Sequence, residues 1–147
     1  MIEYRKGNLF LDCTPPAVLV HGCNAQGVMG SGFAKQFKEV FPEAYHKYLN
    51  QFNLQLGQVI SMEYGDITVC SAITQKFYGR DKTIRYVDYW AVQQSLLKVA
   101  ELATLAKDRP IYMPFIGGGL ANGNREILAE IFEEVFENST AYIYTLD

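Results

Sequence analysis

Hydrophobic residues follow two different spacings along this chain, and the change of spacing marks its elements. The continuous apolar run at 17–20, which comes after a double proline, is typical of a strand buried on both faces. Beyond a glycine-rich segment, Phe33, Phe37 and Phe41 recur at helical spacing until Pro42 interrupts the pattern. The sequence therefore predicts a buried strand that leads through a glycine loop into a helix.

The same two spacings predict the rest of the chain. Strands are expected at 2–6, 111–116 and 141–146, and a hairpin over 58–74 turns at Gly65-Asp66. Helices are expected at 43–52, 87–108 and 125–138, with a polar and aromatic loop at 74–86. This alternation predicts one α/β domain over residues 1–147, with a mixed sheet sandwiched between helices. Ligands of such sheets bind at the carboxyl ends of the strands.

Composition narrows the class of protein. Hydrophobic residues make up 49% and charged residues 20% of the 147 residues, which fits a globular chain and not a disordered one. The formal net charge of −3 argues against a broad surface for nucleic acid, which needs clustered Lys and Arg. This net charge does not exclude a pocket for a nucleotide, because backbone N–H groups can hold phosphate.

The cysteines and the hydropathy indicate where the protein is found. Cys13, Cys23 and Cys70 show no metal-ligand spacing, and their odd number fits reduced thiols better than a disulfide framework. The first ten residues have no apolar signal core, and no window is apolar enough for a membrane span. We expect a cytoplasmic protein with no membrane contact, no metal and no cofactor.

Two glycine-rich loops each join an expected strand to an expected helix. The first contains Gly22, Gly27 and Gly30, and the second contains the run 117–119. Glycine lets the backbone approach a ligand closely, and a helix N-terminus offers free N–H groups and a partial positive charge. Neither loop has the Walker A or the dinucleotide-binding pattern. One such loop is common in α/β proteins, but two together favour a small ligand that carries phosphate.

The loops and their flanking strings resemble those of the macro domain family of ADP-ribose-binding modules. The strings are RKGNLF at 5–10, VLVHGCNAQGVMGSGFAKQF at 18–37, YMPFIGGGLANGNREIL at 112–128 and AYIYTL at 141–146. They cover most of the chain in the family's order. The resemblance is strongest to the branch of ADP-ribose 1''-phosphate phosphatases and small ADP-ribosyl hydrolases. It implies a three-layer α/β/α fold with a mixed six-stranded sheet, and ADP-ribose or its 1''-phosphate as the ligand.

The resemblance also implies roles for individual residues. Adenine is expected at Gly7, Asn8 and Leu9, with Asn8 in a place where many members have Asp. The distal ribose is expected at Asn24. The diphosphate and the remaining contacts are expected at Gly22, Cys23, Gly27, Val28, Met29, Gly30, Ser31, Gly32, Thr74, Lys76, Ile116, Gly117, Gly118, Gly119 and Leu120.

Catalysis is expected at His21, with Asn24 and Gln75 beside it. The string VHGCN matches the place where the phosphatases have a histidine, and a histidine that titrates near neutral pH can move protons. The alternative is that His21 only bonds a neighbouring group. The ADP-ribosyl hydrolases of this branch have a lysine where this chain has Gln75; Lys76 comes one residue late, and on an extended chain would point to the other face. The glutamate-removing hydrolase of this branch also has an aspartate after the second loop, where this chain has Ala121.

Three functions follow from these residues. The one we favour is an ADP-ribose 1''-phosphate phosphatase. The second is a hydrolase that removes ADP-ribose from protein or DNA, and the third is a module that binds ADP-ribose without turnover. Among the remaining polar residues, Asn124 is expected to cap the helix that follows it. The helical aromatic residues, which include Tyr48, Phe52, Trp90 and Phe132, are expected in the core.

Overall fold

A single mixed sheet organises the part of the chain that the computed structural model describes, residues 1–28 and 32–145. Its strands lie in the order β1-β6-β5-β2-β4-β3, and all neighbours are parallel except the β3–β4 hairpin. The strands are β1 Ile2–Lys6, β2 Ala17–Asn24, β3 Val59–Tyr64, β4 Ile67–Gln75, β5 Ile111–Pro114 and β6 Ala141–Thr145. β2 lies in the middle, and Ala17 to Val20 are at most 1% exposed, as a strand covered on both faces requires.

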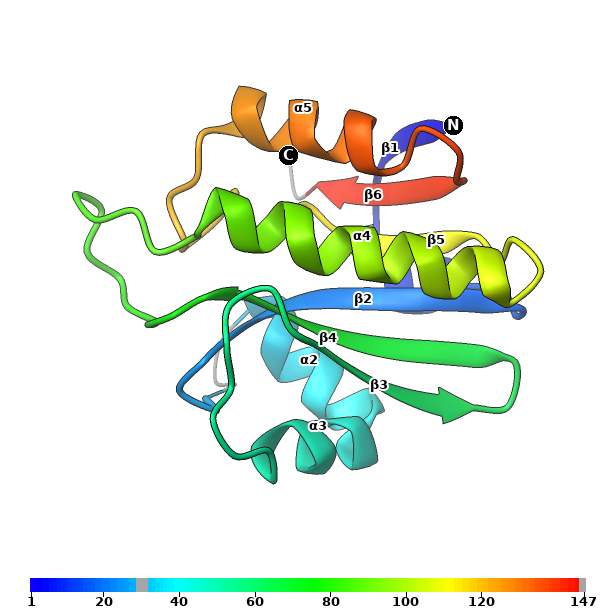
Figure 1. Cartoon of the computed structure of the whole chain (residues 1–147), viewed down its shortest axis with the longest axis horizontal. Coiled ribbons are helices and arrows are strands. Elements are labelled where there is room, and N and C mark those ends of the chain that lie inside the picture. Colours follow the sequence, from blue (N-terminus) through cyan, green and yellow to red (C-terminus); the bar gives the residue numbers. More distant parts are fainter. Residues whose placement is uncertain (29–31, 146–147) are drawn as a thin grey trace.

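Helices cover both faces of this sheet and give three layers. On one face lie α1 (Leu9–Asp12), α2 (Gly32–Val40) and α3 (Pro42–Leu49), which contribute Phe37 and Tyr48 to one hydrophobic cluster. On the other face lie α4 (Tyr89–Leu105) and α5 (Arg125–Val135), which contribute Leu96 and Phe132 to the second cluster. Figure 1 shows α4 and α5 crossing the near side of the sheet, with α2 and α3 at its other side. The expected α/β/α architecture with a mixed six-stranded sheet is confirmed.

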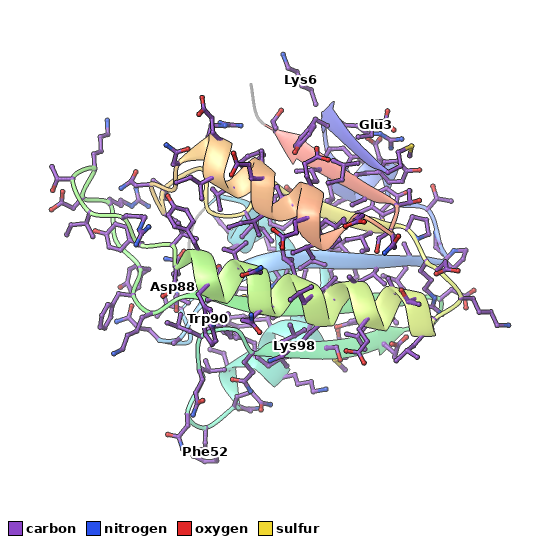
Figure 2. All side chains as sticks on the ribbon, turned by 45° about the horizontal axis from the view of Figure 1, so that its top comes forward. Glu3, Lys6, Phe52, Asp88, Trp90 and Lys98 are labelled. Atoms are coloured by element: carbon purple, nitrogen blue, oxygen red, sulfur yellow. The ribbon has the colours of Figure 1, made fainter. Side chains whose placement is uncertain are left out.

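Side chains cap the N-termini of three of the helices. The amide oxygen of Asn8 accepts a hydrogen bond from Phe10 N, and a carboxylate oxygen of Asp88 accepts one from Ala91 N. Asn124 accepts two, from Glu126 N and Ile127 N, so its expected capping role is confirmed. Figure 2 shows Asp88 at the beginning of α4.

The structure differs from the sequence pattern in four places. Helix α1 was not expected, and β4 continues to Gln75, one residue into the predicted loop beyond Thr74. Helix α3 ends at Leu49, so Phe52 lies beyond it and is 93% exposed. Trp90 is 59% exposed and covers the backbone of Gly57, so the expectation that these two aromatic rings lie in the core was wrong (Figure 2). Helical spacing alone does not reveal which face of a helix is covered. Within the described residues, no helix is long and apolar enough to cross a membrane.

Candidate functional site

A cavity of about 880 Å³ opens at the carboxyl ends of β2, β4, β5 and β6. It extends from Gly7–Phe10 and Thr145 at one end to Gln75 and Tyr78–Arg80 at the other. The two glycine loops lie between these ends, since they follow the central strands β2 and β5. This is the edge of an α/β sheet where ligands bind.

Asn24 at the end of β2 organises the first glycine loop. Its amide oxygen accepts from Gln26 N at 3.1 Å and from Val28 N at 3.2 Å, and its Nδ2 donates to Val28 O at 2.9 Å. The buried hydroxyl of Tyr48 donates to the main-chain and side-chain oxygens of Asn24. An amide has one acceptor atom and two N–H donors, so most of its capacity is used inside the protein. Only one Nδ2 hydrogen remains for the ribose contact that the family resemblance implies.

A β-bulge at the end of β4 turns two consecutive residues into the cavity. In the β2–β4 ladder Cys23 pairs with Ile73 and Asn24 pairs with Gln75, which leaves Thr74 as the extra residue. Thr74 and Gln75 both line the cavity, although neighbours on a regular strand point to opposite faces. Gln75 Nε2 donates to Phe77 O at 2.7 Å, and its amide oxygen makes no hydrogen bond within residues 1–28 and 32–145.

The second glycine loop packs too tightly against its surroundings for a side chain at position 117. Gly117 has a φ of +84°, and a Cβ there would lie 2.8 Å from a Val87 methyl group. Gly117 O accepts from Gly123 N at 2.8 Å, which folds the loop back onto itself. Gly118, Gly119 and Leu120 line the cavity between these points. Glycine at position 117 is therefore required by both conformation and space.

His21 lies beneath the cavity and not in its wall. Its side chain is on the α2 face of β2, 1% exposed and stacked on Phe37 with ring centroids 3.5 Å apart. Its Nε2 is 3.0 Å from Ser71 Oγ, and Cys23 Sγ lies 3.4 Å from the same nitrogen. Burial lowers the pKa of His21 from 6.5 to about 3, so the ring is neutral at physiological pH. A direct contact between His21 and a phosphate does not agree with this position.

The described lining residues carry positive charge only. Arg80 and Arg125 are the two charged residues among them, and no Asp or Glu is present in that set. Burial raises the pKa of the Cys23 thiol, which also keeps this residue neutral. The described residues contain no group of three His, Cys, Asp or Glu side chains that could hold a metal ion. A cavity with this lining attracts anions.

Comparisons with known proteins agree with this architecture. No family model matches the chain. The ADP-ribose 1''-phosphate phosphatase of Candida albicans is 26% identical, with 99% of this chain and 100% of that protein covered. The DNA ADP-ribosyl glycohydrolase of Thermus aquaticus is 28% identical over 81% of this chain but is covered over only 33% of its own length. The macrodomain of Mycobacterium tuberculosis DarG superposes with a TM-score of 0.81 at 21% identity, covering 98% of this chain and 97% of that one.

The chain has the macro domain fold, and its sequence is similar to those of ADP-ribose 1''-phosphate phosphatases. The family resemblance placed most ligand contacts at the macro domain cavity, and the structure brings the greater part of them together. Those that line it are Gly7, Asn8, Leu9, Gly22, Cys23, Asn24, Val28, Thr74, Gln75, Ile116, Gly117, Gly118, Gly119 and Leu120.

Three of the other expected residues do not line the cavity. Gly27 has a φ of +76° but is absent from the lining, as are His21 and Lys76. Lys76 is exposed, with its Nζ 5.6 Å from the centre of the Phe77 ring, so the bulge at Thr74 does not bring it to the ligand side. Gly32 begins α2. Met29, Gly30 and Ser31 lie outside the described residues.

Sequence reasoning missed several functional features of this macro domain. Tyr48 was assigned to the core, and its hydroxyl proves to hold Asn24. Neither Arg80 nor Arg125 was among the expected contacts, yet both line the cavity. At the adenine end, the Asn8 oxygen expected to meet the base already accepts from Phe10 N as the cap of α1. Asn8, which comes directly after a glycine and before apolar residues, was the available N-cap signal for that short helix.

Proposed function

We propose that this macro domain binds ADP-ribose in the cavity and hydrolyses the terminal phosphate monoester of ADP-ribose 1''-phosphate. The observation that carries the proposal is one cavity at the ends of β2 and β5, which Asn24 and Val28 of the first glycine loop and Gly117 to Leu120 of the second line together. Their backbone N–H groups suit a diphosphate held from two sides. The full-length similarity to a protein named for this activity supports the choice of substrate.

Most of the lining serves to hold and orient the substrate. Asn8 and Leu9 lie at the adenine end, and the first loop, shaped by Asn24, holds the diphosphate against Gly118 and Gly119. Hydrolysis adds water to phosphorus and breaks the bond from phosphorus to the ribose oxygen, which gives ADP-ribose and inorganic phosphate. Holding water and ester in line is a large part of the catalytic effect in phosphoryl transfer.

Gln75 is our choice for the residue that positions the water. It lines the cavity at the end opposite Asn8, and its amide is fixed through Nε2 on Phe77 O. That bond leaves the amide oxygen available as an acceptor for a water hydrogen. His21 has a structural role beneath the cavity. It keeps the end of β2 packed on Phe37 and Ser71, and it does not exchange protons with the substrate.

A turnover assay tests this function. Purified protein is incubated with ADP-ribose 1''-phosphate, and ADP-ribose and free phosphate are followed together. Gln75→Ala should lower kcat about 10- to 100-fold, the effect of a misplaced nucleophile, and leave the affinity for ADP-ribose within about 2-fold. Absence of product from wild-type protein that binds ADP-ribose would contradict the proposal. It would favour instead the function of a module that binds ADP-ribose without turnover.

The second candidate is removal of ADP-ribose from DNA, which the similarity to the Thermus aquaticus glycohydrolase favours. This candidate requires Lys76 to reach the ligand, as the corresponding family lysine does. Lys76→Ala separates the two functions: the phosphatase should retain its turnover, whereas a lysine-dependent hydrolase acting on an ADP-ribosylated thymidine oligonucleotide should lose its activity.

A further inference from the structure

The loop between β4 and α4 forms the end wall of the cavity, and its backbone is fixed on both sides. Tyr78 N donates to Gln26 Oε1 of the first glycine loop at 2.9 Å. Asn122 Nδ2, from the second glycine loop, donates to Asp81 O at 2.9 Å and to Ile84 O at 2.7 Å. The loop that carries these groups is therefore attached to both phosphate-binding loops through side-chain bonds.

Arg80 lies between these attachments. Gly79, before it, packs against the Tyr86 ring so closely that a side chain would not fit. Asp81, after it, donates its N–H to Tyr86 Oη at 3.1 Å. Arg80 lines the cavity at its exposed rim, and its side chain makes no ion pair or hydrogen bond with any described residue. The backbone entropy of placing this cation at the cavity wall is therefore already lost in the folded protein, which favours its use as a ligand contact.

Strand order fixes the end of the ligand that Arg80 meets. From β1 to β4 the sheet order has four steps, which at about 4.8 Å each gives a distance of about 19 Å. Asn8 follows β1 and lies at the adenine end, and the two glycine loops follow the strands in the middle. Arg80 lies beyond β4. A ligand extended along this edge therefore presents to Arg80 the end that is furthest from adenine.

Arg125, the other cation of the described lining, lies at the opposite end of the cavity from Arg80. The guanidinium of Arg125 lies 4.6 Å from the centre of the Phe115 ring, and Phe115 contacts Tyr4 of β1 with ring centroids 6.3 Å apart. Arg125 is thus on the β1 side of the cavity, and Arg80 is the charged residue of the described lining at the other end.

We propose that Arg80 is the specificity residue for the terminal phosphate: its guanidinium binds the 1''-phosphate and makes the phosphorylated ligand bind more tightly than ADP-ribose. The proposal rests on the proposed function for the identity of the ligand. A guanidinium can donate two parallel N–H bonds to a phosphate, and bonds of this charged kind are about twice as strong as neutral ones. ADP-ribose lacks the phosphate and loses only this contact.

The test compares Arg80→Ala with Lys82→Ala. Lys82 is an exposed cation of the same loop, two residues away, that does not line the cavity. Arg80→Ala should lower kcat/KM for ADP-ribose 1''-phosphate about 10- to 100-fold and change the calorimetric Kd for ADP-ribose by less than about 2-fold. Arg80→Lys should retain part of the preference for ADP-ribose 1''-phosphate over ADP-ribose. It keeps the positive charge but loses the two parallel N–H donors of the guanidinium. Lys82→Ala should change neither quantity.

Different outcomes separate this proposal from the function on which it rests. Equal losses for both ligands in Arg80→Ala, no loss for either, or the same loss in Lys82→Ala would each overturn the role of Arg80. If the wild-type protein shows no turnover, the Kd of each ligand is measured for wild type and Arg80→Ala. A preference for ADP-ribose 1''-phosphate that disappears in Arg80→Ala would then support Arg80 and refute only the phosphatase. A wild-type protein without that preference would overturn the role of Arg80 even if turnover occurs.

Discussion

His21 should affect the pH dependence of stability and not the chemistry, and His21→Asn tests this. The pKa of His21 is about 3 in the folded protein because the ring is buried, against 6.5 when it is exposed to water. Since the folded-state pKa is the lower one, the stability that depends on the neutral ring is complete above pH 6.5. It is lost as the pH falls from 6.5 toward 3.

The magnitude follows from linkage between protonation and folding. Each pH unit below 6.5 should remove about 1.4 kcal/mol of unfolding free energy through His21. Between pH 7 and pH 5 the loss through this residue is therefore about 2 kcal/mol. All other titratable groups are the same in the wild type and in the variant. The difference between the two proteins isolates the histidine.

Urea unfolding at pH 7, 6 and 5 measures this difference. At pH 7 the His21→Asn variant should have a lower free energy of unfolding than the wild type, because Phe37 loses its stacked ring. At pH 5 this difference in unfolding free energy should be smaller by about 2 kcal/mol. His46→Asn is the matched control: His46 is the other histidine of the chain and lies exposed on α3. The His46→Asn variant controls for the loss of an imidazole at an exposed position.

Two results would refute this reasoning. A gap that stays constant between pH 7 and pH 5 would show that His21 is not held neutral by burial. A His21→Asn protein that binds ADP-ribose with normal affinity but has lost all turnover would show that His21 takes part in the chemistry.

Three further predictions concern the loops. Tyr48→Phe should lower the free energy of unfolding, measured by urea titration, by about 1–3 kcal/mol, because the main-chain oxygen of Asn24 loses the Tyr48 hydroxyl as its donor. The same variant should weaken ADP-ribose binding. The control Tyr45→Phe, on the same helix, should lower the free energy of unfolding by less than about 0.5 kcal/mol. Gly117→Ala should lower the melting temperature and the ADP-ribose affinity together, because of its φ of +84° and the nearby Val87 methyl group. Asn122→Ala should release the β4–α4 loop, detectable as faster amide hydrogen exchange around Ile84 with the sheet unchanged.

Local features of the chain were predictable from the sequence because they depend on neighbours along the backbone. The run Ala17–Val20 is buried on both faces, Gly65 makes the β3–β4 turn with a φ of +59°, and Asn124 caps α5 as expected. The glycine loops lie where a strand passes into a helix, as their spacing indicated. That residues 1–147 form one domain stays a prediction.

The parts that sequence reasoning could not place depend on which face of an element meets which partner. Strings such as VHGCN fix the order of residues, but the register of β2 against α2 decides that His21 packs on Phe37 while Asn24 reaches the cavity. One extra residue in β4, visible only in its pairing with β2, turns Gln75 toward the ligand side and leaves Lys76 outside the cavity. The hydrogen bonds of Asn122 to a loop about 40 residues away bring Arg80 to the cavity wall. The sequence by itself thus determined most of the elements and indicated the class of ligand. The tertiary structure decided which side chains can touch the ligand, because long-range packing and strand register set side-chain direction.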